Sequence, residues 1–306
     1  MFGRITTMMT AQATMSDLTL AFDRLTQTQS ELSSGKKIQE PSDDPYGMSL
    51  IVSMQGQLGA LTAYGNNITD GTAWTQASQT AMTNIANIVQ RVRELTVAAS
   101  NGTNTTSNLS GYAAEVQQLI SAVKQEANTT YNGQYLFAGT ANVQPYQTST
   151  GDLYQGNSGS SAVIDRLIGP NTTVQVNVDL SQVLGNGAAG QGGPDGKLLD
   201  TLNNIYQDMT TGNTTALTNT DLGNLDTNFS NLTQMQASLG ATEDRLQLAS
   251  SRIQDLNTAD TTVLSNTQDA DMAQTEINYS TQQAAYQAAL KAGANIVQGS
   301  LLDFLK

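Results

Sequence analysis

The stretch LDTNFSNLTQMQASLGATEDRLQLASSRI, residues 225–253, decides the fold class of this chain of 306 residues. Within it an aliphatic side chain recurs every seven residues. These side chains are Leu225, Leu232, Leu239, Leu246 and Ile253. Further apolar residues fill the complementary heptad positions as far as Val263. An apolar seam with this period, sustained over several heptads, predicts coiled-coil packing of a long helix.

Working outward from that stretch, we find other helical segments with the same spacing. Apolar residues step by three and four along residues 8–32, 51–68, 82–99 and 112–123. A proline inside a helix costs about 3 kcal/mol, and no proline occurs in residues 46–144 or 195–306. Gly35 follows the first segment, where it is well placed to end a helix. We therefore expect long helices on both sides of a central segment.

The central segment has the signals of short strands. Residues 135–137, 162–164 and 173–180 are rich in β-branched or aromatic side chains, and Gly, Pro and Ser bound them. We expect a small β-rich insertion over residues 141–194. Since it shares no heptad with the flanking helices, we expect the helical bundle to fold without it.

The predicted fold is mainly α. It is an elongated antiparallel helical bundle or coiled coil in which the N- and C-terminal helices pair, with the small β-rich insertion at the tip. We expect a terminal coiled-coil assembly domain from residues 1–45 and 258–306. Residues 46–140 and 195–257 would form a helical bundle domain, and residues 141–194 would form the insertion.

Composition excludes several classes of function. With 13 Lys and Arg against 26 Asp and Glu, the formal net charge is −13, which disfavours a nucleic-acid partner. No apolar run is long enough to span a membrane, and residues 1–16 lack the features of a cleaved secretory signal. The chain has no Cys and no His, so we expect no zinc site, no cofactor and no enzymatic activity.

Three patterns could carry chemistry, and each has a simpler interpretation. Residues 185–190 match G-x-G-x-x-G, but no helix-forming sequence follows, so a flexible linker is the better interpretation. Asp43 with Asp44, and Asp269 with Asp271, could hold a cation or serve a polysaccharide-active enzyme. Two acids do not supply the ligands of a calcium loop, and solvated turns or helix surfaces explain the pairs better.

Three blocks of sequence resemble the flagellin superfamily of bacterial flagellar axial proteins. LSSGKKI at 32–38, followed by PSDDP at 41–45, resembles the turn after the first helix of that family. RVRELTVAASNGT at 91–103 resembles its central helix, and NIVQGSLLDFLK at 295–306 resembles its C-terminal end. NGQYLFAGT at 132–140 is more similar to the hook-associated branch of the superfamily than to filament flagellins.

The resemblance implies a structural adaptor that forms a ring of identical subunits at the hook-filament junction. Its partners would be copies of itself, a neighbouring hook-associated protein, flagellin, and an export chaperone at the C-terminal segment. The protein would be extracellular, exported by the flagellar type III apparatus without a cleaved signal peptide. A short filament flagellin is the alternative, and a secreted polysaccharide-active enzyme is an alternative of another class.

The resemblance and the heptads together assign candidate contact residues. The assembly interface of the terminal helices would comprise Met8, Met15, Leu18, Phe22, Leu25, Leu32, Tyr279, Tyr286, Leu290, Val297, Leu301, Leu302 and Phe304. Contacts at the turn between subunits would come from Lys36, Lys37, Asp43 and Asp44. The family's contacts to the innate flagellin receptor fall on Arg91, Leu95 and Glu115. The terminal seams contain many polar residues, so we expect both ends to be largely unfolded in the free monomer.

Overall fold

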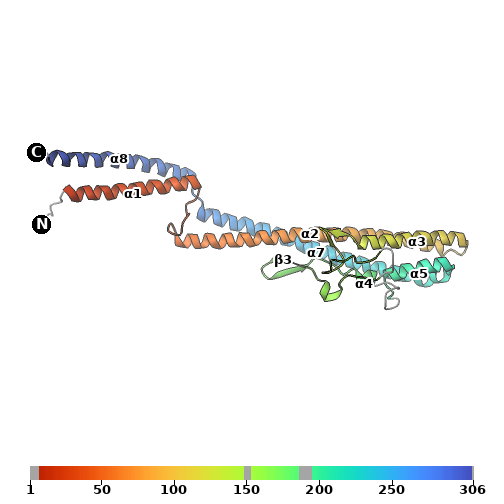
Figure 1. The fold of residues 1–306 in the computed structure, drawn as a ribbon. Coiled ribbons are helices and arrows are strands. Elements are labelled where there is room, and N and C mark those ends of the chain that lie inside the picture. Colours follow the sequence, from red (N-terminus) through yellow and green to blue (C-terminus); the bar gives the residue numbers. More distant parts are fainter. Residues whose placement is uncertain (1–6, 148–152, 186–194, 305–306) are drawn as a thin grey trace. The chain divides into compact units, whose positions relative to one another are not determined.

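The computed structural model describes residues 7–147, 153–185 and 195–304, without the side chains of residues 7, 8, 10, 11 and 295–304. The chain forms two compact units. Residues 1–60 and 256–306 make the smaller unit, and residues 61–255 make the larger one. Most of the described chain is helical (Figure 1), as the sequence predicts.

The smaller unit pairs the two ends of the chain. Helices α1 (Thr7–Ser34) and α8 (Met272–Phe304) lie side by side and antiparallel (Figure 1). Helix α1 stops where the sequence predicts, because Gly35 adopts a φ of 69° and its amide donates to the carbonyl of Glu31 at 2.8 Å. A left-handed residue of this kind ends a helix, and glycine adopts that conformation without a steric penalty. The predicted pairing of the terminal helices is confirmed.

The larger unit is a helical bundle. It contains most of α2 (Pro45–Ala99) and of α7 (Leu222–Gln268), together with α3 (Thr106–Ala127) and α5 (Leu198–Thr211). The heptad seam of residues 225–253 faces its core: Leu225, Leu232, Leu239 and Leu246 are buried, and Ile253 packs against them. Between α5 and α7 the chain forms a short helix, α6 (Thr214–Ala216), and one π-helical turn, η2 (Leu217–Asp221).

Strands are few and short. β1 (Thr130–Tyr131) pairs antiparallel with β2 (Gln134–Tyr135), and β3 (Asp165–Gly169) pairs antiparallel with β4 (Thr172–Gln175). A 3-10 turn, η1 (Gly159–Ala162), and a short helix, α4 (Ser181–Leu184), complete the described part of the insertion.

The strand predicted over residues 173–180 ends early, and the one predicted over 162–164 does not form. The side chain of Asn177 takes up backbone groups at this point. Its Oδ1 accepts the amide of Ile164 at 2.7 Å, and its Nδ2 donates to the carbonyl of Ala162 at 2.6 Å. Side-chain amides thereby satisfy backbone groups that a regular ladder would pair.

The described part of the insertion shares the core of the helical bundle, which argues against the expectation that the bundle folds without it. Tyr146, Val176 and Leu184 are buried in the same cluster as the heptad leucines. A Cβ atom on Gly71 of α2 would lie only 3.0 Å from Val176. The insertion is therefore not independent of the helices, because its apolar side chains complete their core.

The position of the insertion also differs from the predicted tip. Arg166 of β3 bonds Asp70 of α2 at 2.8 Å, and Asn67 donates to the carbonyl of Leu167 at 2.9 Å. Both contacts lie near the middle of α2, so the described part of the insertion flanks the bundle.

Candidate assembly surfaces

The two terminal helices pack against each other through polar, aromatic and aliphatic side chains. Thr28 donates a short hydrogen bond to Gln282, and the rings of Phe22 and Tyr286 lie with centroids 5.7 Å apart. A Cβ atom on Gly293 would lie 3.3 Å from Leu18, which lies near the middle of α1, so the helices approach closely there because the residue is glycine.

The smaller unit has little core of its own. In its described part, Ile38 and Ile51 are the apolar side chains that the chain itself buries. Many large apolar side chains of this unit are instead exposed: Met9, Met15, Leu20, Phe22, Tyr46, Val52, Leu256, Val263, Met272, Ile277 and Leu290. So much exposed apolar surface on one unit is typical of a surface that a partner covers.

The predicted interface residues divide into three groups. Leu18, Leu25, Leu32, Tyr279 and Tyr286 are half-buried between or beside the paired helices. Met15, Phe22 and Leu290 are exposed by 73%, 50% and 44%, respectively. The side chains of Met8, Val297, Leu301, Leu302 and Phe304 lie outside the described residues. The sequence reasoning missed Leu20 and Ile277, since neither falls on the seam from which it started.

The turn after α1 is held from within the chain. Asp43 Oδ2 accepts the backbone amides of Gln39 at 2.9 Å and Glu40 at 3.0 Å. These hydrogen bonds lower the pKa of the Asp43 carboxyl. A catalytic acid needs the opposite shift, so the geometry gives Asp43 the role of a turn anchor.

One acid of each pair singled out in the sequence caps the helix that follows it. Asp44 precedes α2, and Asp271 precedes α8. Asp44 Oδ1 accepts the amide of Tyr46 at 3.1 Å at the start of α2. Asp271 Oδ1 accepts the amides of Ala273 at 3.0 Å and Gln274 at 3.2 Å at the start of α8. Both are N-caps, which satisfy amides that have no partner within their helix.

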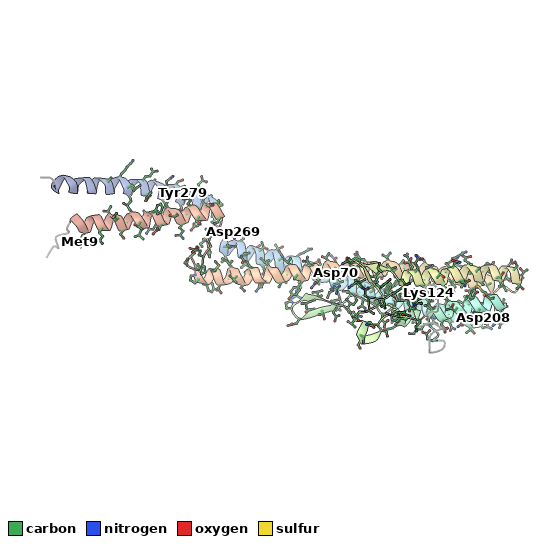
Figure 2. All side chains as sticks on the ribbon, viewed as in Figure 1. Met9, Asp70, Lys124, Asp208, Asp269 and Tyr279 are labelled. Carbon is green, nitrogen blue, oxygen red and sulfur yellow. The ribbon has the colours of Figure 1, made fainter. Side chains whose placement is uncertain are left out.

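Backbone contacts join the two segments that connect to α1 and α8. Lys37 donates its backbone amide to the carbonyl of Gln268 at 2.7 Å, and the amide of Ala270 donates to the carbonyl of Gly35 at 2.9 Å. Lys36 and Asp269 form an isolated antiparallel bridge (Figure 2 labels Asp269). The side chains of Lys36 and Lys37 are exposed, and their predicted contacts with other subunits stay a prediction.

Within the described residues, the geometry supports neither acid pair as a chemical site. Asp269 Oδ2 accepts the hydroxyl of Ser265 at 2.6 Å. No cluster of three or more metal-ligating side chains occurs in the described part of the chain. Of the G-x-G-x-x-G stretch, Gly185 ends α4, and residues 186–190 lie outside the described residues.

On the larger unit, the predicted receptor residues do not share one surface. Arg91 bonds Glu115 of α3 at 2.8 Å and Glu94 at 3.0 Å, and the bond to Glu115 raises the pKa of the Arg91 guanidinium. Leu95, in contrast, is buried in the core. The receptor contact therefore stays a prediction for Arg91 and Glu115 alone.

Sequence reasoning missed two features that depend on the register between helices. Arg93 of α2 donates two hydrogen bonds to the carboxylate of Asp226 on α7, at 2.7 and 3.4 Å. A groove of about 760 Å³ lies between the insertion and α7, lined by amide and hydroxyl side chains such as Gln175, Gln234 and Thr242. No motif in the sequence marks either one.

Family comparison supplies the remaining evidence. The profile of the bacterial flagellin N-terminal helical region matches residues 5–142, and that of the bacterial flagellin C-terminal helical region matches residues 222–305. The chain belongs to the flagellin superfamily. The matched regions contain the paired terminal helices and most of the bundle, while the insertion lies largely between them.

Relatives from both branches of the superfamily align with nearly the whole chain. Flagellar hook-associated protein 3 of Salmonella typhimurium is 25% identical over 317 residues, which cover 98% of this chain and 99% of that protein. Flagellin of Bacillus subtilis is 28% identical over 289 residues, which cover 90% and 91% of the two chains.

Solved structures of flagellar proteins share the fold. A putative flagellar hook-associated protein from Vibrio parahaemolyticus has a TM-score of 0.65 at 18% identity, over 74% of this chain and 100% of that one. FlgL of Bacillus cereus has a TM-score of 0.57 at 20% identity, over 68% and 97%. None of the described helices is both long and apolar enough for a membrane span.

Proposed function

We propose that this protein is a structural adaptor of the bacterial flagellum, which joins the hook to the filament by self-assembly into a ring. The observation that carries the proposal is the alignment with a hook-associated protein 3 over 98% of this chain and 99% of that protein. The alignment includes the insertion as well as the terminal helices, so it extends beyond the regions that define the superfamily.

The distribution of apolar surface supports an assembly role. The larger unit buries its heptad leucines completely, whereas the smaller unit leaves large side chains such as Met15 and Ile277 exposed. Burying one such side chain contributes about 1.5–3 kcal/mol. Contacts with identical copies, with a neighbouring hook-associated protein and with flagellin would each provide that burial. An export chaperone would cover the C-terminal segment before assembly.

The location of the protein along isolated flagella tests the proposal. A labelled antibody should mark one spot at the distal end of the hook, and a strain without the gene should carry hooks that lack filaments. Label along the whole filament would instead identify a short filament flagellin, which the similarity to Bacillus subtilis flagellin favours as the second candidate.

A matched pair of variants tests whether the exposed surface of the smaller unit is the assembly surface. Met15 on α1 and Leu248 on α7 are exposed by 73% and 71%, so Met15→Gln and Leu248→Gln remove similar apolar groups. We expect both purified monomers to retain their stability within about 0.5 kcal/mol. Met15→Gln should reduce incorporation at the hook, while Leu248→Gln should not. Equal incorporation of the two variants would contradict the assignment.

A further inference from the structure

Two acids, Asp208 and Asp221, lie on the segment that leads from the last turn of α5 to the start of α7. Asp208 lies in the last turn of α5, and Asp221 is the last residue of the π-helical turn η2 (Figure 2 labels Asp208). Asp221 is only 3% exposed, and its Oδ2 is buried without any hydrogen-bond partner. A buried carboxylate oxygen with no donor is costly, so this pair requires an explanation.

The turn holds Asp208 in place opposite Asp221. The backbone amide of Asn213 donates to the carbonyl of Asp208 at 2.8 Å, and its side-chain Nδ2 donates to Asp208 Oδ1 at 3.0 Å. Asn213 Oδ1 in turn accepts the amide of Ala216. Asp208 is therefore fixed by the same residue that starts α6, on a helix that packs against η2, which carries Asp221. The Asp208 carboxyl contributes to the raised pKa of Asp221.

Among the described residues, no base contributes to the raised pKa of Asp221. Residues 198–221, which include α5, α6 and η2, contain no Lys or Arg. On α2, Arg93 pairs with Asp226 and Arg91 with Glu94 and with Glu115 of α3.

The remaining base of α3 is distant from the acids. Leu109 of α3 lies near the end of α5, since a Cβ atom on Gly212 would be 3.9 Å from it. Lys124 is about 22 Å further along α3, at 1.5 Å per residue. Asp208 is thus the charged group that acts on Asp221.

We propose that Asp208 and Asp221 share one proton, and that this proton fastens the turn between α5 and α7. Two carboxylate oxygens in contact are both acceptors, so a stable contact needs a proton between them. The proposal does not depend on the flagellar role. The two residues are called the acid clasp below.

The clasp makes the larger unit sensitive to pH. Burial, together with Asp208, raises the pKa of Asp221 from 3.8 to about 7. The folded state therefore binds a proton more tightly than the unfolded state. The clasp stabilises the fold fully below about pH 4, and this contribution is lost as the pH rises through about 7.

Urea unfolding of the full chain tests the clasp. Trp74 is the single tryptophan and is buried in the larger unit, so its fluorescence reports that unit. We expect the midpoint of the wild-type protein to fall between about pH 5.5 and pH 8. Asp221→Asn should largely remove this fall. At pH 8 its urea midpoint should be higher than that of the wild-type protein, because the amide of the new side chain donates to Asp208 at every pH. Asp208→Asn should behave in the same way.

The control is Asp226→Asn, a change five residues further along the chain. Arg93 lowers the pKa of Asp226, so this variant should keep the wild-type fall between the two pH values. A fall of equal size in the wild type and in both clasp variants would overturn the proposal. So would a rise in the wild-type midpoint at pH 8 on adding Ca²⁺ or Mg²⁺ that Asp221→Asn lacks, since a metal ion would then hold the pair.

Discussion

At the scale of single residues, variants of Asp44 can distinguish its role as a helix cap from its predicted role as a contact between subunits. Its carboxyl caps α2. Asp44→Ala should destabilise the start of α2 by about 0.5–2 kcal/mol, whereas Asp44→Asn should keep most of the cap because asparagine also accepts the amide. Hydrogen exchange of the amides of residues 46–50 measures both effects.

The same two variants address the predicted contact between subunits. If the charge of Asp44 binds a neighbouring subunit, Asp44→Asn will lose incorporation at the hook as strongly as Asp44→Ala. If the cap is its whole role, Asp44→Asn will assemble normally. The hydrogen bond to Tyr46 favours the second outcome.

At the scale of elements, the insertion is part of the bundle that it flanks. Eight apolar residues of its described part lie in the common core: Tyr146, Tyr154, Ile168, Val174, Val176, Leu180, Val183 and Leu184. Joining Thr140 to Asp195 with a short flexible linker would uncover the surface that they cover, at a cost of about 1.5–3 kcal/mol for each side chain. We therefore expect the shortened chain to lose cooperative unfolding of the larger unit, measured by Trp74 fluorescence.

A less severe change serves as the control for that deletion. Val176→Ala removes two buried methyl groups from the shared core and should destabilise the unit by roughly 1–3 kcal/mol while keeping the transition cooperative. A shortened chain as stable as the wild type would restore the expectation of an independent insertion.

At the scale of the whole molecule, the two units should differ in stability. The larger unit has a continuous core, and the smaller unit buries few apolar side chains in its described part. A paired helix without a core opens readily. Trypsin should therefore cut the free monomer quickly at Arg24 and Lys291. It should spare Arg91 and Arg93, which lie on the larger unit in ion pairs.

The trypsin experiment also tests the expectation that the chain ends fold on assembly. Cleavage at Arg24 and Lys291 should slow down once the protein is incorporated into flagella, because neighbouring subunits then cover the terminal helices. Equal resistance of all four sites in the free monomer would show that the contacts between α1 and α8, such as Thr28 with Gln282, suffice to hold the ends.

The sequence by itself determined the helices and the surfaces that they bury. The seam from Leu225 to Ile253 predicts the buried face of α7 correctly, because burial follows the helical period, which is a local property of the chain. Gly35 could be placed for the same reason, since the end of a helix depends on the conformation of one residue.

Only the tertiary structure decided which surfaces meet. Val176 packs on Gly71, and Arg93 forms an ion pair with Asp226, although long stretches of chain separate the members of each pair. Asp208 influences Asp221 across a turn. Heptads fix which face of each helix is apolar, but not the register or order in which helices and insertion pack. Those contacts depend on how all the side chains fill one shared core, which no local pattern encodes.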